Sequence, residues 1–213
     1  MNLLDIVLHL DNHLLKLVAE YGIWVYGILF AIVFSETGFV VTPFLPGDSL
    51  LFVAGAIAAT GELNVYALAA LLSLAAILGN TVNYAIGRWL GKSFFTESGS
   101  RWLNKKHLDK AHEFYERHGG KAVVISRFLP IVRTYVPFVA GMAAMAPRAF
   151  TMYNVAGAVL WVGSLAFAGF FFGNIPWIRG NLTAIIVGIV VVSMLPLVFA
   201  FVKSRMASKA ASA

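Results

Sequence analysis

Long runs of apolar residues without any charged side chain follow one another along much of the chain. A helix that crosses the hydrocarbon core of a membrane needs about 20 consecutive apolar residues, and three of these runs meet that length. The pattern therefore predicts three membrane-spanning helices, at residues 63–90, 149–176 and 180–203.

Two further apolar stretches, residues 21–59 and 122–145, are interrupted by proline and glycine. Proline removes a helical hydrogen-bond donor and clashes with the preceding turn, so the apolar runs on either side are too short to cross comfortably. Irregular backbone at membrane depth survives only where protein or a water-filled cavity covers it. We predict two re-entrant helical hairpins, and the alternative is a pair of proline-kinked spanning helices. The predicted helix breakers are Pro43, Pro46, Gly47, Pro130 and Pro137.

Two amphipathic segments complete the single membrane domain that we predict for residues 1–213. Residues 1–20 carry apolar side chains at helical spacing, which predicts a helix lying on the membrane surface. Residues 92–121 form a hydrophilic connector with a narrow apolar stripe, which we expect to end at Gly119 and Gly120. Because the connector is rich in Lys and Arg, we expect it and the C-terminus in the cytoplasm, and the N-terminus outside.

The composition agrees with a membrane location. Of the 213 residues, 60% are hydrophobic and 12% are charged, and the mean hydropathy is +0.81, whereas soluble domains carry about 25% charged residues. The net charge of +6 is better explained by cytoplasmic loops than by nucleic-acid binding. The chain has no cysteine and no metal-ligand spacing, phosphate-binding loop or dinucleotide motif, so we expect no enzyme, metal or cofactor.

The two interrupted stretches share a sequence pattern. Phe-Leu-Pro at residues 44–46 and at 128–130 precedes Phe-Val-Ala-Gly at residues 52–55 and at 138–141. If the hairpins enter from opposite sides, the two halves form an inverted repeat, which transporters use to build a site near the membrane midplane. Each copy is followed by a long predicted helix that ends in two glycines, Gly87 with Gly91 and Gly169 with Gly173.

Four charged residues lie inside the predicted hairpins: Glu36, Asp48, Arg127 and Arg133. Each costs on the order of 3 kcal/mol at the bilayer centre unless it is paired or hydrated. The first hairpin is acidic and the second is basic, so hairpin tips that face each other would neutralise these charges. One interpretation is a set of salt bridges that only lock the hairpins together. The other is a wet cavity in which the carboxylates carry protons and the arginines bind phosphate.

Other polar and aromatic residues give weaker signals. Asn80 and Asn83 lie within the first predicted spanning helix, where hydrogen bonding between helices is favoured over contact with a substrate. Tryptophans in such a chain are typical of anchors at the membrane interface. This interpretation applies to Trp24, Trp89, Trp102, Trp161 and Trp177.

Four motifs surround the charged residues. They are Glu-Thr-Gly at residues 36–38, Pro-Phe-Leu-Pro-Gly-Asp-Ser-Leu-Leu at 43–51, Arg-Phe-Leu-Pro-Ile-Val-Arg at 127–133 and Val-Pro-Phe-Val-Ala-Gly at 136–141. These motifs resemble those of the DedA family, whose domain is also called the VTT or SNARE-associated domain. The likeness covers nearly the whole chain, and its detail is nearest to the YqjA/YghB branch of bacterial inner-membrane proteins.

The resemblance implies an all-α integral membrane protein with two re-entrant hairpins in an inverted repeat. It also implies lipid transport across the bacterial inner membrane, with undecaprenyl phosphate or phosphatidylethanolamine as cargo. Glu36 and Asp48 are implied as an essential acidic pair, and Arg127 and Arg133 as an essential basic pair. The branch is tied to the proton-motive force, but we expect an acid there at the position of Asn80, which weakens the implication of proton coupling here.

The leading hypothesis is a lipid flippase or scramblase in which Arg127 and Arg133 hold a phosphate group. One alternative is a proton-coupled antiporter of small cations or drugs that supports envelope homeostasis, and another is a membrane scaffold without transport. The expected partners are a membrane lipid and, in the coupled mechanisms, protons. A homo-oligomer is compatible with all three hypotheses.

Overall fold

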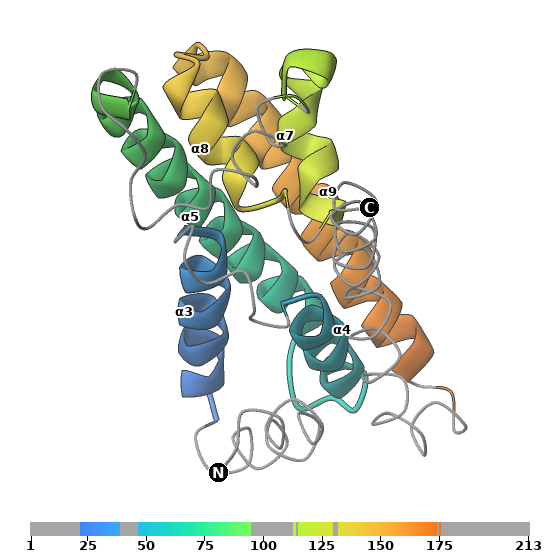
Figure 1. Ribbon diagram of the computed structural model, residues 1–213. Helices are drawn as coiled ribbons and strands as arrows, with labels where there is room; N and C mark the ends of the chain where they lie inside the picture. Colours follow the sequence, from blue (N-terminus) through green and yellow to red (C-terminus); the bar gives the residue numbers. More distant parts are fainter. Residues whose placement is uncertain are drawn as a thin grey trace, which may run out of the picture.

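The computed structural model describes residues 22–38, 47–94, 113, 115–129, 132–173 and 175, and every regular element among them is helical. The predicted all-α class is therefore confirmed for this part of the chain. The predicted segments 1–20 and 180–203, most of the connector, and Pro43, Pro46 and Pro130 lie outside the described residues. The helices, numbered as in Figure 1, are α3 (Trp24–Gly38), α4 (Gly47–Ala58), α5 (Val65–Phe94), α7 (Lys121–Ile125), the 3-10 helix η1 (Ser126–Phe128), α8 (Tyr135–Met142) and α9 (Pro147–Gly173).

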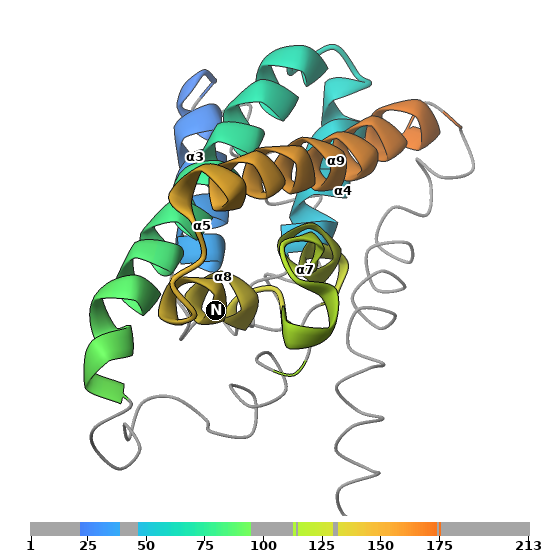
Figure 2. The same ribbon diagram turned by 90° about the horizontal axis from the view of Figure 1, so that it is seen from above.

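The two long helices, α5 and α9, coincide with the first two predicted spanning helices, and each is long and apolar enough to cross a membrane. They lie side by side and run in opposite directions (Figures 1 and 2). At one end the ring of Tyr66 packs edge-on against Phe167, with ring centroids 5.7 Å apart. At the other end Tyr84 stacks on Phe150, with centroids 4.1 Å apart. This antiparallel pair forms the frame that the shorter helices surround.

Local sequence explains where the helices begin and end. The Asn64 side chain caps α5 by accepting two backbone N–H groups of its first turn at 3.0 Å. Pro147 opens α9, at a position where the missing N–H costs no helical bond. Leu129 turns extended after η1, as expected for a residue before proline. Gly119 ends a helical turn with φ +57°, as predicted. Pro137 lies in the first turn of α8, so it does not break that helix.

The shorter helices form two pairs with the same pattern of contacts. The first helix pair is α3 with α4, and the second helix pair is α7 and η1 with α8. In Figure 1 the first pair lies at the lower end of the bundle and the second at the upper end. The leading helix of each pair packs on the long helix of its own half, α3 on α5 and α7 on α9. The trailing helix packs mainly on the long helix of the other half, α4 on α9 and α8 on α5. This exchange supports the inverted repeat, which, like the re-entrant entry of the pairs, stays a prediction.

Each trailing helix touches its long helix through a glycine that allows the backbones to meet. In the α4–α9 contact, a Cβ on Gly169 would collide with the carbonyl oxygen of Phe52. In the α8–α5 contact, a Cβ on Gly87 would collide with the carbonyl oxygen of Phe138. Phe52 and Phe138 open the two copies of Phe-Val-Ala-Gly, so the repeated motif makes the same close contact in both halves.

The outer side of α9 is apolar as well as its inner side. Met152, Val159, Leu160 and Phe171 are each more than half exposed in the structure. Exposed apolar surface of this extent marks a membrane or protein contact, and a helix that is apolar all round is typical of a membrane span. The outer side of α9 is therefore suited to lipid.

Candidate functional site

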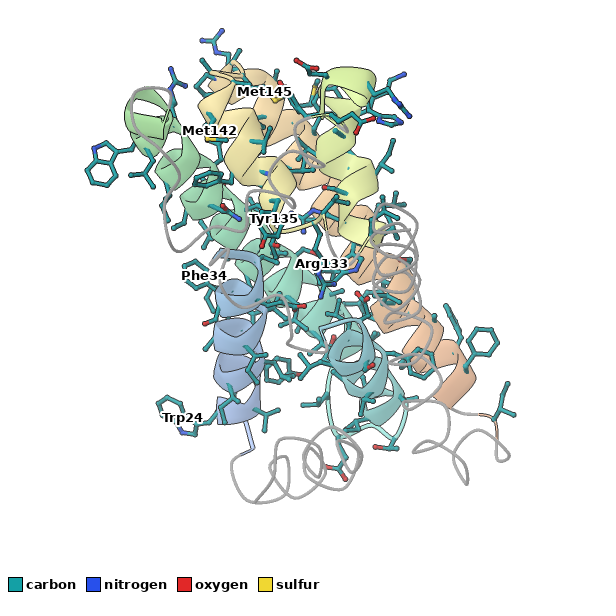
Figure 3. The ribbon with its side chains drawn as sticks, in the orientation of Figure 1. Trp24, Phe34, Arg133, Tyr135, Met142 and Met145 are labelled. Atoms are coloured by element: carbon teal, nitrogen blue, oxygen red, sulfur yellow. The ribbon has the colours of Figure 1, made fainter. Side chains whose placement is uncertain are left out.

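Three of the four predicted charges form one buried ion-paired group. Arg133 lies in the turn just before α8, and Figure 3 shows it in the middle of the molecule, between the two helix pairs. One terminal nitrogen of its guanidinium donates to Glu36 Oε1, and the other donates to Asp48 Oδ1 at 3.0 Å. Glu36 is close to the end of α3 and Asp48 is in the first turn of α4. Ion pairs therefore connect the inner ends of the two helix pairs.

A glycine at the start of α4 makes room for the buried acid. Glu36 is fully buried, and its carboxylate lies so close to Gly47 that a Cβ there would overlap it. The Asp48 side chain is 22% exposed, so this acid is the less enclosed of the two. Gly47 was predicted as a helix breaker, but in the structure it is the first residue of α4 and accommodates the Glu36 carboxylate.

Trp161 of α9 contacts both arginines and one of the acids, Asp48. Its indole Nε1–H donates to Asp48 Oδ1 at 2.9 Å. The guanidinium carbons of Arg127 and Arg133 lie 5.9 Å and 5.7 Å from the ring centroid, within the range of a cation–π contact. Trp161 is 2% exposed, so the prediction that it anchors the membrane interface is wrong. Trp24 and Trp89, in contrast, are mostly exposed, as interface anchors are.

Arg127 has a different environment from Arg133. It is 3% exposed, and its guanidinium donates to Asn154 Oδ1 at 2.7 Å and to the Ala76 carbonyl at 3.3 Å. Its side-chain stem lies against Gly157 of α9, which leaves space for it. Within the part of the chain that the structure describes, no carboxylate forms an ion pair with Arg127. One buried cation is thus neutralised by two acids, while the other contacts neutral groups.

The two asparagines of α5 take different positions. The Asn83 amide nitrogen donates to the Thr134 carbonyl at 2.7 Å and to the Thr37 carbonyl at 3.4 Å. Asn83 therefore links α5 to both helix pairs, which is the interhelical role that the sequence favoured. Asn80 is also buried, and it lines the cavity at the centre of the site.

A small cavity lies between the inner ends of the pairs. The centre of a water molecule can occupy about 10 Å³ of this cavity. The cavity therefore holds about one water. Three hydrogen-bond donors of this region lack partners among the described residues: Arg127 Nε, Arg133 Nε and the Thr134 hydroxyl. The cavity is lined by Glu36, Thr37, Asn80, Arg127, Arg133, Thr134 and Trp161.

The structure thus brings the four predicted charges to one place, and the functions predicted for them stay predictions. Asn154 and Thr134 were not predicted from the sequence as residues of this site, and Trp161 was not predicted to face inward. Asn154 carried a usable signal, because an amide within a charge-free spanning run is a candidate for buried hydrogen bonding. Within the described ranges, no cluster of His, Asp and Glu could hold a metal ion.

Comparison with known proteins identifies the family. The model of the VTT domain matches residues 45–171. Protein DedA of Escherichia coli K12 is 55% identical over 212 residues, covering 99% of this chain and 97% of the relative. The inner membrane protein YghB of the same organism is 37% identical over 155 residues, covering 73% and 71%. YqjA is 36% identical over 151 residues, covering 71% and 69%.

Identity to Protein DedA is therefore higher than to either member of the branch singled out from sequence. No solved structure matches the chain. The VTT-domain match covers the motifs at residues 127–133 and 136–141 and nearly all of the motif at 43–51. It therefore includes Asp48, Arg127 and Arg133, and the alignment to Protein DedA covers almost the entire chain. With these matches, and with its apolar helices, the chain belongs to the DedA family of VTT-domain membrane proteins.

Proposed function

We propose that this protein moves a phosphate-bearing lipid between the two leaflets of the bacterial inner membrane, with Arg127 and Arg133 holding the phosphate group. The observation that carries the proposal is Arg127, a buried guanidinium whose partners among the described residues are neutral. A charge at membrane depth costs on the order of 3 kcal/mol or more when it is unpaired. A phosphate group would supply the negative charge that Arg127 lacks.

The donors around the cavity suit the same ligand. Arg127 Nε, Arg133 Nε and the Thr134 hydroxyl have no partners among the described residues, and phosphate oxygens accept several hydrogen bonds at once. The cavity has room for about one water, so a phosphate group enters only when the two helix pairs separate. The lipid tails stay in the bilayer, along the apolar outer side of α9.

Arg133 is the charge that exchanges partners in this mechanism. Glu36 and Asp48 hold it when the pairs are together, and the phosphate group replaces them when the pairs part. Protons taken up by the two carboxylates would weaken their hold on Arg133, which is how transport could be coupled to a proton gradient. Undecaprenyl phosphate and phosphatidylethanolamine are the lipids that we propose as substrates.

Transport of a labelled lipid tests the proposal. The purified protein is reconstituted in liposomes containing phosphatidylethanolamine with a fluorescent tail, and dithionite destroys the label in the outer leaflet only. Lipid movement shows as bleaching beyond the outer-leaflet share. We expect Arg127→Gln to slow the movement by about tenfold or more, since a hydrogen bond to a charged group is worth about 1.5–3 kcal/mol. The matched control is Arg148→Gln, which removes an exposed arginine at the start of α9.

The outcomes separate the three hypotheses. Lipid movement that is lost in Arg127→Gln and kept in Arg148→Gln supports the proposal, provided that both variants elute as single folded species. Proton flux driven by a cation gradient, without lipid movement, would favour the antiporter. If neither activity occurs and substitutions at the site only lower stability, the protein is a scaffold and the proposal is wrong.

A further inference from the structure

We propose that Asn154 determines the charge specificity of the site, because it holds Arg127 in position without neutralising it. This inference rests on the proposed function. Asn154 is a positioning residue in this view: it acts on the phosphate group through Arg127. An acid at the same place would also accept from the guanidinium, but it would cancel the charge that attracts the lipid, and it would lose the donor to the Ile77 carbonyl.

The hydrogen bonds of Asn154 fix the orientation of its amide. Asn154 is fully buried on the inner side of α9. Its nitrogen donates to the Ile77 carbonyl at 3.0 Å and to the Thr81 hydroxyl at 3.3 Å, both on α5. Because a carbonyl only accepts and a guanidinium only donates, the amide oxygen must face Arg127, which it does at 2.7 Å. Two long helices are thus used to place one neutral acceptor.

The neutrality of this acceptor decides the charge of the site. The four ionisable residues, Glu36, Asp48, Arg127 and Arg133, sum to zero when all are charged. The two acids lie on Arg133, so the positive charge of Arg127 is not offset by its immediate contacts. A carboxylate at position 154 would neutralise Arg127 and make the site negative as a whole. Such a site would repel a phosphate group.

The experiment compares variants of similar shape and different charge. Binding of dioctanoyl phosphatidic acid to the full-length protein in detergent is measured by its effect on thermal unfolding, with dioctanoylglycerol as the ligand that lacks the phosphate. We expect Asn154→Asp to weaken phosphatidic acid binding by at least about tenfold, because a new negative charge then lies next to Arg127. Asn154→Ser, which is neutral but shorter, should weaken binding less.

Charge rescue distinguishes this role from a structural one. In the double variant Asn154→Asp with Asp48→Asn the sum of charges returns to zero, and we expect part of the lost affinity to return. If Asn154 acted only through its hydrogen bonds, Asp48→Asn would rescue nothing, because it restores no donor to the Ile77 carbonyl. That result would overturn the inference.

Two further observations keep the test decisive. If Asn154→Asp does not fold, Thr81→Asp places an acid beside Asn154 at an exposed position, and it should weaken binding relative to Thr81→Asn. Equal binding by these two variants would contradict the inference. If the unmodified protein binds phosphatidic acid no better than dioctanoylglycerol, the proposed function itself fails. Tight binding by the unmodified protein with no effect of the added acid would refute only the role of Asn154.

Discussion

The two helix pairs are packed alike but charged differently. Both place a trailing helix on the long helix of the other half through a glycine, and both use the motif Phe-Val-Ala-Gly to do so. Their inner ends, however, carry opposite charges: Glu36 and Asp48 in the first pair, Arg127 and Arg133 in the second. The backbone framework is thus common to the two halves, whereas the chemistry belongs to each half separately. Substitutions in the framework should act alike in both pairs, and substitutions of the charges should not.

The largest expected effect concerns the charges. Arg133→Gln removes the guanidinium that forms ion pairs with Glu36 and Asp48, and breaking a buried pair in this way costs about 3–5 kcal/mol. Arg127→Gln leaves no carboxylate behind among the described residues, so its cost should be clearly smaller. Thermal unfolding of the two variants in detergent measures the difference. The loss in Arg133→Gln should shrink in the double variant with Glu36→Gln, which removes one of the two carboxylates that Arg133 neutralises.

An equal loss of stability in Arg127→Gln and Arg133→Gln would contradict this view. It would mean that Arg127 is as fully paired as Arg133, and that the two cations do not have separate functions.

The next effect concerns the shared framework. Gly169→Ala and Gly87→Ala each force a methyl group against a carbonyl oxygen of the crossing helix. Overpacking of this kind typically costs about 1–3 kcal/mol, and we expect similar losses for both variants. Gly163→Ala is the matched control, since a Cβ there meets nothing within 4 Å. It should be neutral or slightly stabilising, because alanine favours a helix over glycine by about 0.5–1 kcal/mol.

Thermal unfolding of the three glycine variants in detergent measures these losses of stability. Sensitivity at Gly169 without sensitivity at Gly87 would show that the two contacts are not equivalent, and the inverted repeat would lose its main support.

The smallest effect concerns Trp161, which contacts both charged regions. Trp161→Phe removes the indole N–H that donates to Asp48 but keeps an aromatic ring beside the two guanidinium groups. We expect a loss of stability of about 1.5 kcal/mol, the low end of the range for a hydrogen bond to a charged group, because Asp48 is partly exposed. Trp161→Leu removes the ring as well and should lose more. A Phe variant as unstable as the Leu variant would show that the N–H, and not the ring, is the important contact.

Much of this arrangement could be predicted from sequence because its signals are local. A run without charge predicts α5 and α9, a proline predicts the extended backbone at Leu129, and a glycine pair predicts the positive φ of Gly119. Charges at membrane depth must find partners, so the meeting of Glu36 and Asp48 with Arg133 also follows from elementary energetics.

What could not be predicted from the sequence is which side of a helix faces which neighbour. α9 is apolar on all sides, so its pattern does not distinguish the lipid side from the inner side. For this reason Trp161 had the same appearance as Trp24, although one is buried and the other exposed. Asn154 differs, because its amide marks it as a candidate for buried hydrogen bonding. The exchange of trailing helices between halves has no sequence signal beyond the repeated motif.

The exchange of trailing helices has a consequence for biosynthesis. The surface on which α4 rests belongs to α9, which begins at Pro147 and leaves the ribosome much later. The arginine that neutralises Glu36 and Asp48 is also made after them in the chain. The contacts that α4 and the two acids make with the late half can therefore form only after Arg133 and α9 have been synthesised. A nascent chain that stops before α9 would present an incompletely assembled membrane segment to the quality-control machinery of the cell.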